Sequence, residues 1–125
     1  MAHTPEHALV WCEIPVTDLS AAVTFYEKVF QYELKIDENG PNPMAFLPFE
    51  GDGIAGHLYP GKPATDGNGP TMHLVVPDKV EDAAARCTEA GGTVLDRPVI
   101  EIPPGRFIYV TDPDGNSLGL FEPKT

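Results

Sequence analysis

Two stretches of this chain share one pattern, and that repetition restricts the folds available to it. Residues 52–61 align without a gap on residues 114–123, and both stretches begin with Asp-Gly. In each stretch a small residue, a Leu and an aromatic residue follow the turn at the same offsets. An internal repeat is the sequence signature of a duplicated structural unit, here of about 60 residues. The chain is therefore predicted to consist of two copies of one module.

Composition fits one small globular unit and excludes several partners. With 125 residues, 42% of them hydrophobic, the chain has enough apolar side chains for a core shared by two modules. Its formal net charge of −11 disfavours nucleic acid and anionic membranes as partners. No apolar run approaches the ~20 residues needed to span a bilayer. Cys12 and Cys87 do not resemble a disulfide framework, so we expect a cytoplasmic protein.

The first module is predicted over residues 8–60 as a strand, a helix and three further strands. Residues 8–16 are rich in β-forming side chains, and Asp18 offers a helix N-cap. Apolar side chains then recur at helical spacing over residues 19–30. The remaining strands are expected at residues 33–36, 44–49 and 53–59, the last two as a hairpin.

A polar linker at residues 61–70, rich in Gly and Pro, precedes a second module over residues 71–123 with the same order. Asp78 matches Asp18 as the expected helix cap, and Gly91-Gly92 ends the helical stripe. Further strands are expected at 93–95, around 99–102, and in the hairpin that closes the chain. The predicted fold class is therefore α+β: two βαβββ modules with curled, mostly antiparallel sheets and both helices on the outer face.

These elements and motifs resemble the vicinal oxygen chelate superfamily, which includes glyoxalase I, extradiol dioxygenases and bleomycin-resistance proteins. The resemblance covers residues 10–123, and its strongest segments are residues 11–19, 25–30, 90–94 and 112–116. It implies two half-barrels that form a concave sheet around a pocket. It does not specify one activity, because this fold hosts several chemistries and some pure binders.

In metal-dependent members, the resemblance implies up to four protein ligands on the first and last strands of the two modules. The matching positions are Trp11, His57, Gly119 and either Met72 or its neighbour His73. Glu13 lies two residues past Trp11, on the same strand face, and offers a carboxylate. Because a catalytic ion needs at least two or three nitrogen or oxygen ligands, Glu13, His57 and His73 form the candidate set for Zn, Ni, Fe or Mn.

The same region also allows a pocket that holds no metal. Its candidate lining is aromatic and apolar and suits a planar ligand: Trp11, Tyr59, Met72 and Phe121. Arg106 is a candidate contact for an anion, and His57 is expected to donate or accept a hydrogen bond on the pocket wall. Ordinary core packing of the aromatic residues, and a structural role for both histidines, remain open alternatives.

Glu13 is the candidate catalytic residue, because a carboxylate between apolar neighbours in a strand is costly to bury alone. A structural salt bridge with Arg106 or Arg97 would also explain its position. Three functions follow. The leading one is binding, or metal-independent processing, of a small organic molecule with no cofactor.

The second function is a divalent-metal enzyme of the lactoylglutathione-lyase or dioxygenase kind, in which Glu13 shuttles a proton. The third is an assembly module without chemistry, so the sequence leaves open whether the protein is an enzyme. A homodimer is expected in each case, because curled half-barrels leave exposed strand edges and an apolar rim.

Overall fold

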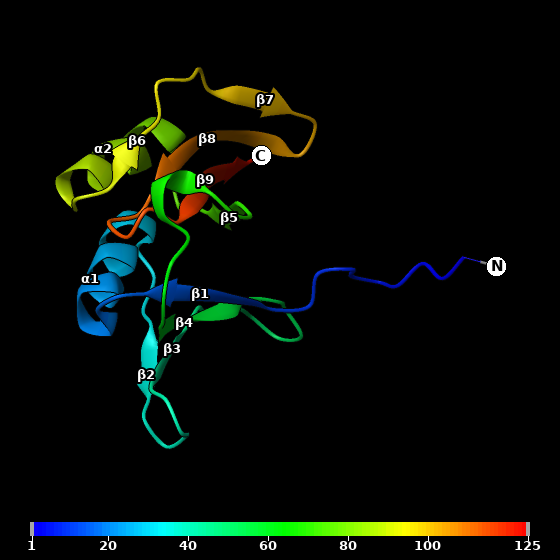
Figure 1. Cartoon of the computed structure of the whole chain (residues 1–125). Helices are drawn as coiled ribbons and strands as arrows, with labels where there is room; N and C mark the ends of the chain where they lie inside the picture. Colours follow the sequence, from blue (N-terminus) through cyan, green and yellow to red (C-terminus); the bar gives the residue numbers. More distant parts are fainter. Residues whose placement is uncertain (1, 125) are drawn as a thin grey trace.

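The computed structural model describes residues 2–124 and contains two helices and nine strands in two sheets (Figure 1). The first half holds β1 (Cys12–Val16), α1 (Leu19–Phe30), β2 (Lys35–Asp37), β3 (Met44–Phe46) and β4 (Gly56–Pro60). A short 3-10 turn (Thr65–Gly67) leads to the second half: β5 (Met72–Val75), α2 (Val80–Glu89), β6 (Thr93–Val94), β7 (Ile100–Ile102), β8 (Gly105–Thr111) and β9 (Ser117–Pro123). The predicted α+β fold class is confirmed.

Each half of the chain forms its own sheet with the same strand arrangement. The first sheet has the order β1-β4-β3-β2, and the second has the order β5-β9-β8-β6. In both sheets the first strand pairs in parallel with the last, and the other pairs are antiparallel. β6 and β7 both pair with β8, at residues 110–111 and 105–107, so they form one interrupted strand. The second module therefore carries one short strand more than the predicted βαβββ order.

Several predicted strands are shorter in the structure, because a strand needs a partner along its length. β1 begins at Cys12, whose backbone N–H donates to the carbonyl of Ala55, and residues 8–11 are not in a strand. Likewise β3 ends at Phe46, the last residue of that strand to pair with β4. Strand-forming composition alone could not reveal where pairing stops.

α1 begins where local sequence rules predict. The side chain of Asp18 accepts a hydrogen bond from the backbone N–H of Ala21 at 3.1 Å, and Gln31 closes the helix in the left-handed conformation. Six buried side chains form its inner face: Ala22, Val23, Phe25, Tyr26, Val29 and Phe30. Apolar spacing in the sequence predicts five of these six residues, and Phe25 is the one it leaves out.

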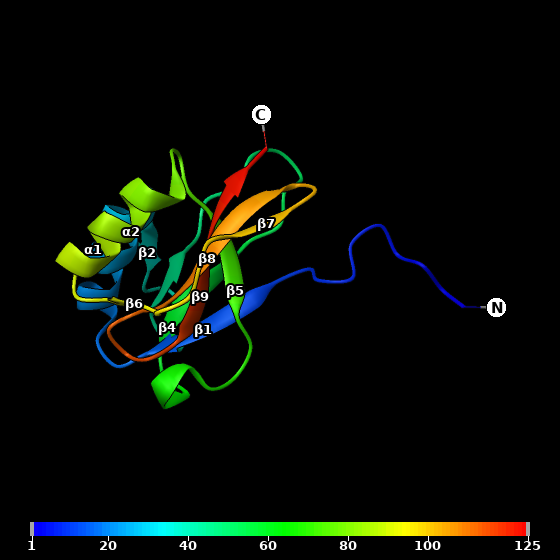
Figure 2. The same cartoon turned by 90° about the horizontal axis from the view of Figure 1, so that it is seen from above.

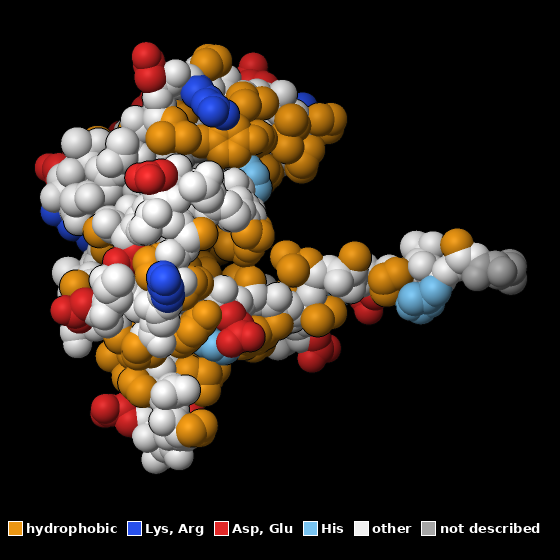
Figure 3. Space-filling view, viewed as in Figure 1, with side chains coloured by type: hydrophobic (Ala, Val, Ile, Leu, Met, Phe, Trp, Pro, Cys, Tyr) orange, Lys and Arg blue, Asp and Glu red, His pale blue; other side chains and the backbone are white. Residues whose placement is uncertain are grey.

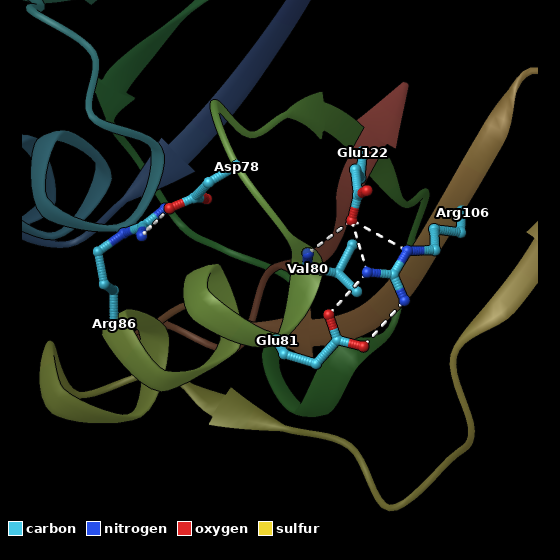
Figure 4. Close-up of polar contacts among 6 residues, drawn as sticks. All are labelled: Asp78, Val80, Glu81, Arg86, Arg106 and Glu122. Carbon is cyan, nitrogen blue, oxygen red and sulfur yellow. Dashed lines mark hydrogen bonds and ion pairs between the residues drawn. The ribbon is translucent and has the colours of Figure 1, made fainter. Parts of the chain in front are cut away.

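α2 begins differently, and the prediction of Asp78 as its cap is wrong. Lys79 occupies the N-cap position without a side-chain hydrogen bond. The backbone N–H of Val80 instead donates to Oε1 of Glu122, on β9, at 3.0 Å (Figure 4). Two hydrogen bonds from Arg86 engage the carboxylate of Asp78 and lower its pKa. The capping oxygen thus comes from the far end of the chain, beyond the reach of local rules.

The two helices lie side by side and cover one side of the sheets (Figure 2). Arg86 joins them, because its Nε donates to the carbonyl of Val29 at 3.0 Å. The core lies between helices and sheets and includes fully buried Leu58, Leu118 and Leu120. Each such leucine contributes about 1.5–3 kcal/mol relative to an exposed side chain. The other face of each sheet is left for a site.

The turn between β8 and β9 ties the two modules together. Asp112 is 3% exposed and accepts hydrogen bonds from the hydroxyl of Tyr26 at 2.8 Å and the amide of Asn116 at 2.9 Å. That amide also donates to the carbonyl of Pro15, and Thr17 donates to Asp114. Burial, followed by the charge of Asp112, raises the pKa of Tyr26. This turn therefore fixes the start of α1 and the end of β1 against the second sheet.

Candidate functional site

Strand register decides which residues share the sheet face turned away from the helices. In the first sheet Glu13 pairs with His57, and in the second His73 pairs with Gly119. Side chains alternate along a strand, and the neighbours Leu58 and Leu118 point into the core. Glu13 and His57 therefore lie on the outer face of the first sheet, and His73 occupies in the second sheet the position that Glu13 occupies in the first.

His57 is 8% exposed and has a partner at each ring nitrogen. The indole N–H of Trp11 donates to its Nδ1 at 3.0 Å, and its Nε2 lies 3.4 Å from Oε1 of Glu13. Because an indole nitrogen can only donate, Nδ1 is the unprotonated nitrogen and the ring proton sits on Nε2. The carboxylate of Glu13 lies within ion-pair distance of Nε2, and its side chain is 64% exposed.

This arrangement does not fit a metal ligand. An ion bound at Nε2 requires the proton to move to Nδ1, where it would meet the N–H of Trp11. Across residues 2–124, no group of three or more His, Cys, Asp and Glu side chains is placed to hold an ion. Glu13, His57 and His73 do not form such a group, since His73 lies on the other sheet.

Aromatic rings surround His57 on this face. The ring centroids of Trp11, Phe46 and Tyr59 each lie 6.0 Å from its imidazole, and Phe49 lies 6.4 Å from Trp11. A cavity of about 480 Å³ borders the cluster, lined by Trp11, Glu33, Lys35, Phe46, Leu47, Pro48 and Phe49. Its volume falls within the ~300–1,000 Å³ typical of small-molecule sites.

His73 lies over Gly119 in the second sheet, where a Cβ on residue 119 would collide with the imidazole. Its ring makes an edge contact with Phe107 at 4.6 Å and lies 5.9 Å from Tyr109. Burial lowers the pKa of His73. His73 also lines a cavity of about 280 Å³ between the modules, together with Leu9, Cys12, Leu47, Ile54, Ala55, Thr71, Met72 and Leu74.

A hollow separates the second module from the extended N-terminal segment, on the side of the molecule away from the helices (Figure 3). Hydrophobic side chains gather along both of its walls. Trp11 directly precedes β1 and is 38% exposed. The structure thus offers an apolar, accessible region beside His57 and His73.

The remaining predicted residues divide between the two sides of the sheets. Tyr59 and Phe121 occupy the outer face, two residues beyond His57 and Gly119 respectively. Met72 points the other way and packs against the core, although it also lines the cavity between the modules. Only the outer-face residues belong to the aromatic walls.

Arg106 lies on the helix side of the second sheet. Its guanidinium donates to Glu81 at 2.7 and 2.8 Å and to Glu122 at 2.9 Å, and these hydrogen bonds raise its pKa (Figure 4). It joins α2 to β9. The alternative of a salt bridge between Glu13 and Arg106 or Arg97 is wrong, because Glu13 faces His57 and Arg97 lies over the ring of Tyr109.

Sequence reasoning missed five side chains of these walls: Phe46, Phe49, Arg97, Phe107 and Tyr109. Two of them carried a usable signal. Phe107 and Tyr109 alternate along β8, so period-two spacing places them on one face with each other. Pairing with β9 then places that face beside Gly119, which only the register could show.

Comparisons with known proteins agree with this architecture. A sequence model of the Glyoxalase/Bleomycin resistance protein/Dioxygenase superfamily matches residues 8–120. The chain is 31% identical over 118 residues to the uncharacterised protein YwbC of Bacillus subtilis, covering 87% of this chain and 92% of that protein.

Two solved structures share the fold. One is a glyoxalase/bleomycin resistance protein from Albidiferax ferrireducens, with a TM-score of 0.70, 21% identity, and coverage of 94% of this chain and 100% of that one. The other is a lactoylglutathione lyase from Agrobacterium tumefaciens, with a TM-score of 0.60, 22% identity, and coverage of 94% of this chain and 95% of that one.

Neither α1 nor α2, the helices of the described chain, is long and apolar enough to cross a membrane.

Proposed function

Because this chain belongs to the Glyoxalase/Bleomycin resistance protein/Dioxygenase superfamily, we propose that it binds a small organic molecule, or processes one without a metal, on the sheet faces turned away from the helices. One observation carries the proposal. The hydrogen bond from Trp11 to Nδ1 of His57 makes His57 a proton donor on the outer face of the first sheet instead of a metal ligand.

The ligand best suited to this site is a planar, largely apolar molecule. Trp11, Phe46 and Phe49 offer ring faces and edges against which such a molecule can stack. Glu33 and Lys35 border the same cavity and supply charged groups at its edge. A mostly apolar lining with a few polar groups is the usual composition of a small-molecule site.

Glu13 is the group that would act on a bound molecule. Its carboxylate is largely exposed and lies 3.4 Å from Nε2 of His57. An exposed carboxylate accepts a proton from an acidic C–H or O–H group of a ligand within hydrogen-bonding reach. Processing, where it occurs, is therefore proton abstraction by Glu13.

Fluorescence of Trp11 tests the proposal, because this is the only tryptophan in the chain. Planar organic molecules should change its emission saturably, whereas Zn²⁺ and Ni²⁺ should not. His57→Ala should weaken ligand binding by about 1–3 kcal/mol and leave the protein folded. Under this proposal no metal is linked to folding, so addition of a chelator should not change the melting temperature. Stoichiometric metal in the purified protein, lost in His57→Ala, would overturn the proposal.

We also propose that the protein is a cytoplasmic homodimer. Leu9 and Val10 are exposed hydrophobic side chains next to the Trp11 and Phe49 wall, and a second copy would cover them. The unpaired thiols of Cys12 and Cys87 support a reducing compartment. Light scattering at micromolar concentration should give twice the mass of one chain, and a monomer would contradict the dimer.

A further inference from the structure

The outer face of the second sheet carries no acidic side chain among the strand residues that the structure describes. Side chains alternate between the two faces of a strand, so the registers of β7, β8 and β9 show which residues share this face. They are aromatic, aliphatic and hydroxyl side chains, together with His73 and Gly119. The chain as a whole has 19 acidic residues and a net charge of −11. An uncharged wall of this extent is therefore unusual for this molecule.

One cation stands over that wall. The guanidinium carbon of Arg97 lies 5.6 Å from the ring centroid of Tyr109, within the range of a cation–π contact. Backbone hydrogen bonds from Leu95 to Tyr109 and from Arg97 to Leu95 hold this segment against β8. Arg97 is exposed and therefore available to a ligand.

Arg97 differs from the other two arginines of the chain. Arg86 pairs with Asp78, and Arg106 pairs with Glu81 and Glu122. Within residues 2–124, no carboxylate forms an ion pair with Arg97. A guanidinium fork without a carboxylate partner is the side chain best shaped to take an anionic group in a two-point contact.

The aromatic wall continues from Arg97 toward the cavity between the modules. Tyr109 lies 5.9 Å from His73 and 5.3 Å from Phe107, and His73 borders that cavity. Phe107 is buried, yet it stands apart from the main core cluster and packs within this wall. Arg97, Tyr109 and His73 therefore follow one another along this wall, with 5.6 Å from the guanidinium carbon to the Tyr109 ring and 5.9 Å from that ring to the imidazole.

We propose that the second module recognises the anionic end of the ligand: Arg97 pairs with a carboxylate, while the adjoining ring lies against Tyr109, Phe107 and His73. This rests on the proposed function and adds the ligand class, an aryl carboxylate. The overall negative charge of the protein repels anions at long range. Selection of an anion therefore depends on Arg97.

The test compares three probes by NMR titration of the full chain: cinnamate, cinnamamide and 3-cyclohexylpropanoate. Cinnamate should bind at least tenfold more tightly than the other two, and its shifts should centre on His73, Phe107 and Tyr109. Arg97→Gln should remove the advantage over cinnamamide, and Arg97→Lys should retain part of it. Lys28→Gln, which removes an exposed cation in the last turn of α1, serves as the charge-matched control and should behave as wild type.

Equal affinity for cinnamate and cinnamamide, or full cinnamate binding by Arg97→Gln, overturns the inference. So does the lack of a saturable shift from any of the probes. The proposed function is judged separately, from the response of Trp11 to planar ligands, because Trp11 belongs to the wall of the first module. A neutral ligand that changes Trp11 emission but ignores Arg97→Gln would leave the proposed function standing and remove this inference.

Discussion

The two modules pair their first and last strands in the same way, but the paired positions carry different side chains on the outer face of each sheet. In the first, the last strand supplies His57 and the first strand supplies Glu13. In the second, the histidine is on the first strand, and the last strand supplies Gly119. His57 is buried and hydrogen-bonded, whereas His73 is exposed and packs on the bare backbone of Gly119. The two modules thus share the strand pairing, and they differ in the side chains that it places on the outer faces.

The two hairpin turns of the repeat diverge in the same way. Asp112 is buried and accepts hydrogen bonds from two side chains and two backbone N–H groups. Its counterpart Glu50 is exposed, and its turn retains the backbone bond from Gly53 to Glu50 that matches the bond from Gly115 to Asp112. The second turn therefore contributes to stability in a way that the first does not.

Asp112→Ala should have the largest effect and tests this asymmetry. Loss of the carboxylate leaves the hydroxyl of Tyr26 and one of the two N–H groups of the Asn116 amide without a buried acceptor, so the free energy of unfolding should fall by about 3–5 kcal/mol. Glu50→Ala is the matched control and should stay within about 0.5 kcal/mol of wild type. Urea denaturation measures both, and equal losses would contradict the contrast between the turns.

Gly119→Ala should destabilise the protein by about 1–3 kcal/mol, because the added Cβ meets the imidazole of His73. Adding His73→Ala should restore part of the loss, which ties the effect to this contact. Gly40→Ala adds a methyl group in a loop, where its Cβ makes an ordinary contact of 3.8 Å with the carbonyl of Asn42, and serves as the control. A loss that persists unchanged in the double variant would show that His73 does not pack on residue 119.

Trp11→His should convert the outer face of the first sheet, at Glu13 and His57, into a metal site. The change removes the indole donor and adds a second imidazole beside His57 and Glu13, giving three ligand-type side chains on one face. Zn²⁺ affinity measured by calorimetry should rise at least tenfold, or about 1.4 kcal/mol. Trp11→Phe removes the donor without adding a ligand and should gain little. Equal Zn²⁺ binding by wild type and Trp11→His would contradict the role given to Trp11.

His73 should give the smallest effect, a pH dependence of stability. Burial lowers its pKa in the folded state, so the unfolded chain binds a proton more readily. Stability should therefore fall as pH decreases below the unfolded value of about 6.5 and level off below the folded pKa. His73→Gln should flatten this part of the stability curve. The same slope in the variant would assign it to another group.

The parts of the fold that follow local rules could be predicted, and those that depend on distant partners could not. Asp18 caps α1 through its own next turn, so its sequence pattern was sufficient. Asp78 looks identical locally, yet Arg86 engages it and Glu122 caps the helix from β9. The two helices are capped differently because β9 brings Glu122 to the start of α2.

The candidate site shows the same division. Alignment of the two repeats made His57 a candidate site residue, and strand alternation placed Glu13 on the face of Trp11; the register of β1 and β4 then pairs Glu13 with His57. The sequence did not show that Trp11 donates to His57, because that bond joins residues 46 positions apart. It also misassigned Arg106, whose helix-side partners became visible only when α2 was packed on β8 and β9.

The central claim is that Nε2 of His57 carries a proton, not a free lone pair, on the outer face of the first sheet. Nitrogen-15 NMR of the imidazole tests this claim most directly. At a pH where the ring is neutral, the long-range correlation pattern should show the proton on Nε2, and Nδ1 should carry the shift of a hydrogen-bond acceptor. Neither signal should move when Zn²⁺ is added in excess. A proton on Nδ1, or a shift of Nε2 on addition of Zn²⁺, would contradict the account.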